Sequence, residues 1–175
     1  MNRRRMQAVF AGGLAMLVAA IGVGAAVAGD GGGDARAKLK GYEEVPSVST
    51  VASGKFKAEI DRSEQIIEYE LSYRDLEANA LFAHIHLGQR AANGGVSVFL
   101  CGGGDKPPCP PTAGTVEGTI DPADVIGPAN QGIAPGEFDE LVRAIRAGVT
   151  YANVHSSKFP GGEIRGQIKG GGDDD

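Results

Sequence analysis

Residues 54–61 read Gly-Lys-Phe-Lys-Ala-Glu-Ile-Asp, so that an apolar or small residue falls at every second place between charged ones. Successive side chains of a strand point to opposite faces of a sheet, and this alternation predicts a strand with one buried and one hydrated face. Residues 114–121 and 162–169 share its template, a glycine followed by apolar, small and apolar residues at alternate positions. Their unequal spacing indicates similar strands of one sheet rather than a solenoid repeat. A small residue in the middle leaves room for a large side chain across it.

The rest of the chain predicts further strands and one helix. Alternating or aromatic-rich runs indicate five more strands, at 37–43, 65–73, 80–87, 95–101 and 149–155. From Phe138 to Ile145 the apolar residues follow the i, i+3, i+4, i+7 spacing of a helix, with acidic residues in its first turn. We therefore predict an all-β fold, an antiparallel Greek-key-like sandwich or flattened barrel of about eight strands with one short helix near 137–147.

The first residues have the features of a secretory signal peptide. Arg3 to Arg5 precede a run of small and apolar residues that ends in Ala-Val-Ala at position 28, and this order is typical of export signals. An uncleaved membrane anchor is the alternative, and only in that case is contact with a membrane expected. The expected division is a signal peptide at 1–28, a flexible linker at 29–36, one folded domain at 37–169 and an acidic flexible tail at 170–175.

Charge and cysteine content narrow the class of protein. The formal net charge is −5. Removal of the signal peptide would remove three arginines and lower the charge to −8 (−5 − 3), so nucleic acid is not an expected partner.

An exported chain folds in a compartment where disulfides form. The only cysteines, Cys101 and Cys109, flank Gly-Gly-Gly-Asp-Lys-Pro-Pro, and we expect a disulfide between them. The expected location is secreted or extracytoplasmic, in a periplasm or at a cell surface.

The three histidines are the residues with the clearest potential for chemistry. His84 and His86 are two apart in a predicted strand, so both point to the same face, opposite Ala83, Ile85 and Leu87. His155 has the outward parity in its own predicted strand. If the two strands pair, the three imidazoles come within reach of one metal ion, and imidazole suits zinc or copper. The alternative is that they are exposed or hydrogen-bonded residues without a metal.

Glu163 and Arg165 share the outward face of the last predicted strand. They could pair with each other, or orient a histidine by accepting its N–H, and the alternative is a surface ion pair of about 0–1 kcal/mol. No convincing Ser-His-Asp order, phosphate-binding loop or pair of carboxylates suggests a reaction, so no catalytic residue is assigned.

The chain resembles a chordin-type (CHRD) domain over about residues 37–169. The residues that carry the resemblance are Leu39 to Pro46, Ala83 to Gly88 with Asn93-Gly94, Tyr151 to His155 and Pro160 to Gly166. The resemblance implies a secreted, β-rich domain. It implies no established reaction for single-domain microbial members, and in chordin itself the context is extracellular protein binding.

A fainter likeness is to the copper/zinc superoxide dismutases. By that likeness His84, His86 and His155 would be copper ligands, and Arg165 would line the approach of an anion. The chain has no other histidine, so the metal-bridging histidine and the histidine-based zinc site are missing, and a full dismutase is not expected.

We therefore expect a secreted, non-catalytic binding or structural module, whose partner is an extracellular protein or a small ligand. The alternative is a mononuclear copper or zinc protein that uses the three histidines, with superoxide-related redox activity. A calcium ion at the acidic tails is a weaker third expectation.

Overall fold

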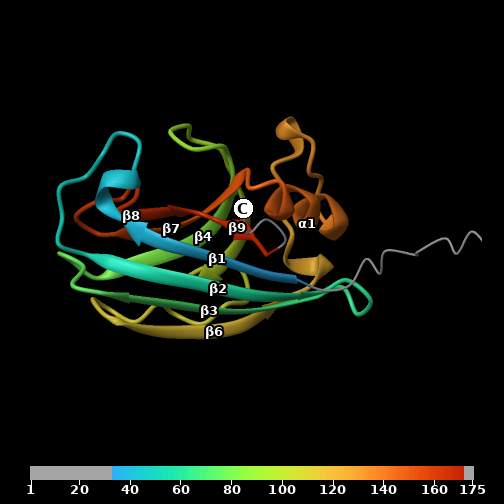
Figure 1. Cartoon of the computed structure of the whole chain (residues 1–175). Helices are drawn as coiled ribbons and strands as arrows, with labels where there is room; N and C mark the ends of the chain where they lie inside the picture. Colours follow the sequence, from blue (N-terminus) through green and yellow to red (C-terminus); the bar gives the residue numbers. More distant parts are fainter. Residues whose placement is uncertain (1–32, 172–175) are drawn as a thin grey trace, which may run out of the picture.

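One strongly curved antiparallel sheet forms the body of the protein in a computed structural model, which describes residues 33–171 (Figure 1). Its strands are β1 Gly33–Lys40, β2 Ser53–Asp61, β3 Ile66–Arg74, β4 Ala80–Leu87, β5 Gly95–Cys101, β6 Gly114–Ile120, β7 Thr150–Ser156, β8 Ile164–Gln167 and β9 Lys169–Gly170. Among residues 33–171 the only α-helix is α1 Phe138–Arg146. The same part of the chain has three short 3-10 helices in loops, at Gly41–Glu43, Pro122–Asp124 and Ala129–Gln131. The predicted all-β fold with one short helix is confirmed.

The strand order is β5-β4-β7-β8-β1-β2-β3-β6, with β9 paired to β1. After β3 the chain crosses to β4 and β5 at the far end of this path, and it returns as β6 beside β3. That crossing is the Greek-key feature. The end strands β5 and β6 approach each other, so the sheet curls into a nearly closed barrel, and α1 packs at one end of it (Figure 1).

The interior is filled by the apolar positions of the alternating strands. Phe56, Ile67 and Leu71 from β2 and β3 are fully buried, as are Leu141 and Ile145 of α1. Burial of one such side chain contributes about 1.5–3 kcal/mol. The helix therefore closes the end of the core with the apolar face that its sequence spacing predicted.

Gly118 occupies the small middle position of the shared strand template, and it leaves room for a large side chain as expected. Tyr69 of β3 lies opposite Gly118 of β6, and a Cβ atom on this glycine would lie 2.7 Å from the Tyr69 hydroxyl oxygen. That hydroxyl donates to the Leu100 carbonyl at 2.7 Å. The missing side chain thus lets the tyrosine ring lie over β6 and bond to β5, so that it links the two end strands of the sheet.

The first strand begins earlier than expected. β1 starts at Gly33 and pairs with β2 along its whole length, so residues 33–36 are not part of a flexible linker. The buried Ala35 continues the alternation of Ala37 and Leu39, but the glycine-rich composition before it resembles a spacer. Residues 41–43, expected to extend this strand, form a 3-10 helix instead. The predicted signal peptide and most of the acidic tail lie outside the described residues.

The two cysteines form the expected disulfide. Cys101 ends β5 and is bonded to Cys109, with their Cα atoms 5.1 Å apart. Within residues 33–171 no helix has the length and apolar character needed to span a membrane.

Candidate metal centre

A row of polar side chains lies on the outer face of β4, β7 and β8, opposite the barrel interior. The register places His86 opposite Tyr151 and His84 opposite Asn153 on the neighbouring strand β7. Because alternate residues of a strand share a face, His155 belongs to the same row of β7 as Tyr151 and Asn153. The predicted pairing of the two histidine-bearing strands is therefore present.

This face is not open to water, contrary to the expectation of exposed imidazoles. His84 is 5% exposed, and His86 and His155 are each 7% exposed. Loops from 41–52, 88–94 and 157–163 cover the face and bond to its side chains. The alternation of apolar and polar residues correctly separated the two faces of the sheet, but it contained no information about the loops that fold over the polar one.

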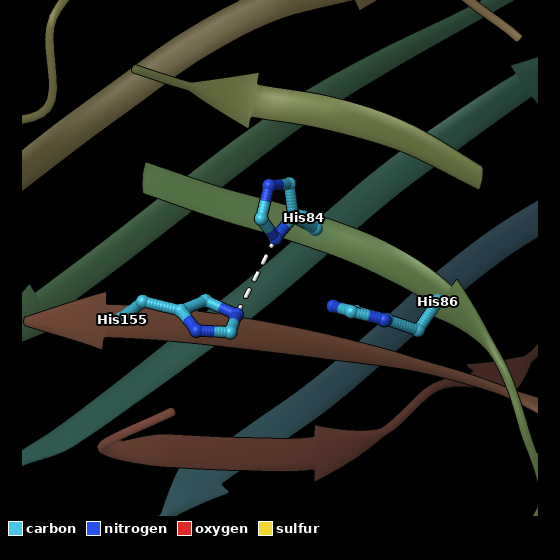
Figure 2. A group of neighbouring side chains, drawn as sticks. All are labelled: His84, His86 and His155. Atoms are coloured by element: carbon cyan, nitrogen blue, oxygen red, sulfur yellow. Dashed lines mark hydrogen bonds between the residues drawn. The ribbon is translucent and has the colours of Figure 1, made fainter. Parts of the chain in front are cut away.

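The three imidazoles converge on one point (Figure 2). His84 Nδ1 lies 3.3 Å from His155 Nε2. One ring nitrogen from each of the three histidines lies within 4.8 Å of the others. Metal–imidazole bonds are about 2.0–2.1 Å long, so a single ion between these nitrogens requires only small movements of the rings.

Backbone carbonyls fix the tautomers of two of these histidines. The His86 Nδ1–H donates to the Gly94 carbonyl at 3.0 Å, and the His155 Nδ1–H donates to the Pro160 carbonyl at 2.9 Å. In the neutral ring the Nε2 atom then carries a lone pair. The His155 Nε2 accepts from His84 Nδ1, whereas the His86 Nε2 is buried and has no hydrogen-bond partner among the described residues.

The surroundings keep all three rings neutral. Burial lowers the pKa of His84 to about 3 and that of His86 to about 4, and it also lowers the pKa of His155. The neighbouring imidazoles act in the same direction at His84, because a second positive charge nearby disfavours protonation. Neutral imidazole is the form that binds a metal ion, so these side chains are in the ligating form at neutral pH.

Aromatic rings enclose the histidines. Phe99 of β5 lies against His84 with ring centroids 4.5 Å apart, and Phe82 contacts His155 at 4.8 Å. Tyr151 stacks on His86 with the two rings nearly parallel and 4.7 Å apart. The three imidazoles are thus held in place by apolar packing, and their polar edges point at one another.

Arg165 does not face an incoming anion. It is 2% exposed, and its guanidinium lies over the Tyr151 ring, 3.4 Å from the ring centroid. Its N–H groups donate to the carbonyls of Gln89 and Ala92 at 3.1 and 2.8 Å, and to the side chain of Asn93. The residue therefore holds the 88–94 loop over the site, and the expected surface position is wrong.

Glu163 is also buried and does not orient a histidine. Its Oε1 accepts from the Thr50 hydroxyl and the Glu77 backbone N–H, both at 2.9 Å. The N–H groups of His86 and His155 are taken by backbone carbonyls instead. Glu163 thus fastens the 41–52 loop and the start of the 77–79 segment to the sheet.

Sequence reasoning missed Glu44, which lies beside this row. Glu44 is 6% exposed, and its Oε1 accepts from the Asn153 side-chain amide at 2.6 Å. Burial raises its pKa to about 7, although the Asn153 bond and the positive charge of Arg165 act in the opposite direction. Nothing in the adjacent pair Glu43-Glu44 indicates which of the two is buried, so the role of Glu44 was not predictable from its local sequence.

Comparison with known proteins finds one family. The family model described as the CHRD domain matches residues 35–168, which agrees with the early start of β1. No curated protein and no solved structure gave a significant match.

Proposed function

The chain belongs to the CHRD-domain family, and on that premise we propose that this member is an exported, non-catalytic module that holds one copper or zinc ion through His84, His86 and His155. The family and the disulfide Cys101–Cys109 are in keeping with an extracellular setting. Secretion by way of the N-terminal signal, and the metal itself, are parts of the proposal.

The observation that carries the proposal is the arrangement of ring nitrogens. Metal-binding histidines almost always donate their other N–H to a carbonyl or carboxylate, which fixes the ring and raises its basicity. His86 and His155 both do so, to Gly94 and Pro160. The His86 Nε2 atom is buried without a partner, and a buried polar atom of this kind is costly unless something occupies it.

The donor set favours copper or zinc over harder ions. The three ligands are neutral imidazoles from two neighbouring strands, and calcium or magnesium would require oxygen ligands. Such a site leaves a coordination position for water or an exogenous group. When bound, the metal would supply Lewis-acid or, for copper, redox chemistry, and the surrounding residues would supply the dry, aromatic enclosure.

Metal analysis of the purified protein tests the proposal. The full chain is expressed with its signal, supplied with copper and zinc at micromolar concentration, dialysed, and analysed for metal per chain. We expect close to one equivalent for the wild type and a loss of at least tenfold in occupancy for His84→Ala, His86→Ala and His155→Ala. Arg143→Gln, at an exposed position on α1, is the control and should retain the metal. A wild-type protein with no metal above background contradicts the proposal, whatever the variants do.

A dismutase assay on the loaded protein then separates storage from catalysis. Full occupancy without superoxide turnover is the result expected for a binding module, whereas turnover that disappears with His86→Ala would replace this part of the proposal with a redox activity.

A further inference from the structure

Arg165 places a positive charge close to the three histidines. Its guanidinium carbon lies over the Tyr151 ring, 3.4 Å from the ring centroid, and the same tyrosine ring stacks on His86 with the centroids 4.7 Å apart. Arg165 is 2% exposed, so water and salt screen its charge only weakly. One aromatic ring thus contacts both a buried cation and a candidate metal ligand.

Within residues 33–171, none of the groups that bond to Arg165 carries a negative charge. Its N–H groups donate to two backbone carbonyls and one side-chain amide of the 88–94 loop. Glu43 and Glu44 attract the guanidinium through space, but Glu43 bonds to Arg90 and Glu44 bonds to Asn153. The positive potential of Arg165 is therefore reduced but not cancelled.

The histidine cluster adds no negative charge of its own. Its ligands are neutral imidazoles, and among the described residues no carboxylate or thiolate belongs to the group of ligand atoms within 4.8 Å of one another. Metal-binding histidines often donate their second N–H to a carboxylate, but His86 and His155 donate to the neutral carbonyls of Gly94 and Pro160. The charge of a bound ion is thus balanced neither by its ligands nor by the groups bonded to them.

Such surroundings favour an ion of low charge. The cost of moving an ion from water into a medium of low dielectric constant rises with the square of its charge, so it is about four times larger for a doubly charged ion than for a singly charged one of the same size. Repulsion by a neighbouring cation is about twice as large. Both effects disfavour Cu(II) and Zn(II) relative to Cu(I).

The number of available ligands favours the same ion. Zinc in proteins almost always has four ligands, whereas Cu(I) is stable with three nitrogen ligands. Phe82 and Phe99 pack against the imidazoles and offer no ligand atom, and the Tyr151 hydroxyl accepts from the Gly94 N–H. The enclosure therefore suits an ion that needs only the three histidines.

We propose that the histidine site holds copper in its singly charged form, Cu(I), and that the charge of Arg165 sets this preference over Cu(II). The inference rests on the proposed function, because it names the ion that the three histidines bind. Arg165 does not ligate the ion. It acts through the electrostatic field that it produces at His86 and beyond. No electron transfer by the protein is involved, since the ion is bound already reduced.

Competition between copper and zinc tests the choice of ion. The full chain is freed of metal with a chelator and supplied, without oxygen, with equal micromolar amounts of copper and zinc and with ascorbate, which reduces Cu(II) to Cu(I). We expect close to one copper per chain and little zinc. Zinc in the site would overturn the inference and leave the proposed function standing, whereas a protein that takes up neither metal would contradict the proposed function itself.

Matched variants test the role of Arg165, with the ratio of the dissociation constants for Cu(II) and Cu(I) as the readout. Each constant is measured by competition with a chelator, at pH 6, where the pKa of Glu44 of about 7 keeps that side chain mainly uncharged. Arg165→Gln should shift the ratio toward Cu(II) on the order of tenfold, the effect of one unit charge about 10 Å away at an effective dielectric constant of about 20. Arg165→Lys keeps the charge and should keep the wild-type ratio.

Both variants lose the guanidinium bonds to the 88–94 loop, so an equal shift in the two would show a purely structural role and refute the inference. Arg143→Gln removes a positive charge at an exposed position on α1, and a shift as large in this variant would refute it as a net-charge effect.

A second variant keeps the test informative if Arg165→Gln does not fold. Glu44→Gln, measured at pH 8.5, removes a negative charge that attracts Arg165. The ratio should therefore move in the opposite direction, toward Cu(I). An unchanged ratio would show that the charges around Arg165 do not reach the ion, which would overturn the inference.

Discussion

The buried carboxyl group of Glu44 provides a test of the electrostatics around the site. Glu44→Gln keeps the shape of the side chain and an oxygen to accept from the Asn153 amide, but it cannot ionise. Burial raises the pKa of Glu44 from 4.5 to about 7, because its charged form loses water that Asn153 and Arg165 only partly replace. The wild type therefore has to bury an unfavourable charge at high pH, and the variant does not.

The direction of the effect follows from proton linkage. Between pH 4.5 and 7 the unfolded chain has lost this proton and the folded chain still holds it, so Glu44 makes wild-type stability fall as the pH rises through that window. Each pH unit between the two pKa values corresponds to about 1.4 kcal/mol. A pKa of about 7 in place of 4.5 corresponds to about 3 kcal/mol. We expect Glu44→Gln to be more stable than the wild type by up to about 3 kcal/mol at pH 8.5, and the two to be nearly equal at pH 4.5.

Urea unfolding of both proteins at half-unit steps from pH 4.5 to 8.5, with EDTA present, measures this difference. The histidines titrate in both proteins, so their contribution cancels when the two free energies of unfolding are subtracted. A constant difference across the pH range would refute the reasoning. A wild type that is more stable than the variant at pH 8.5 would show that attraction to Arg165 outweighs burial.

Three further changes probe the loops that cover the site, and urea unfolding measures each. Gly162→Ala should lower the free energy of unfolding by at least about 2 kcal/mol, because Gly162 has a φ of 125° and a Cβ atom would lie 2.5 Å from Glu44 Oε1. An unchanged urea midpoint would show that the loop adapts to the added methyl group. Arg165→Lys should lower the free energy of unfolding by about 2–3 kcal/mol, because lysine lacks the planar guanidinium group that donates to several acceptors at once. Wild-type stability in this variant would mean that the bonds to the 88–94 loop contribute little. Cys101→Ala/Cys109→Ala should lose about 2–3 kcal/mol on the loop-entropy account, and no loss would indicate an equally restricted loop in the unfolded chain.

The fold was predictable because its strands alternate. The apolar positions of 54–61, 114–121 and 162–169 predicted which face of each strand is buried. The helical spacing of apolar residues in 138–145 predicted the helix that covers one end of the barrel. The start of β1 was not predictable, because Gly33 and Asp34 have low strand propensity and are held by pairing with β2 and by the Gly171 N–H, which donates to the Asp34 carbonyl. Tertiary pairing of this kind leaves no local signal in the sequence.

The candidate site was predictable in part for the same reason. Residue parity grouped His84 with His86 and placed His155 outward, and the structure brings the three rings together. Their burial, and the roles of Arg165 and Glu44 in fastening loops, depend on contacts between segments far apart in the chain. One sequence does not indicate which loop lies over which face.

The separation of the histidines along the chain has a consequence for how the protein would acquire its ion. His84 and His155 are 71 residues apart, and β7, which carries His155, is among the last strands to leave the ribosome. An incomplete chain offers only the His-x-His pair, so the three-histidine site forms only when the barrel closes. The supply of copper or zinc in whichever compartment hosts that final closure, rather than the supply at the site of synthesis, would then decide which ion is trapped.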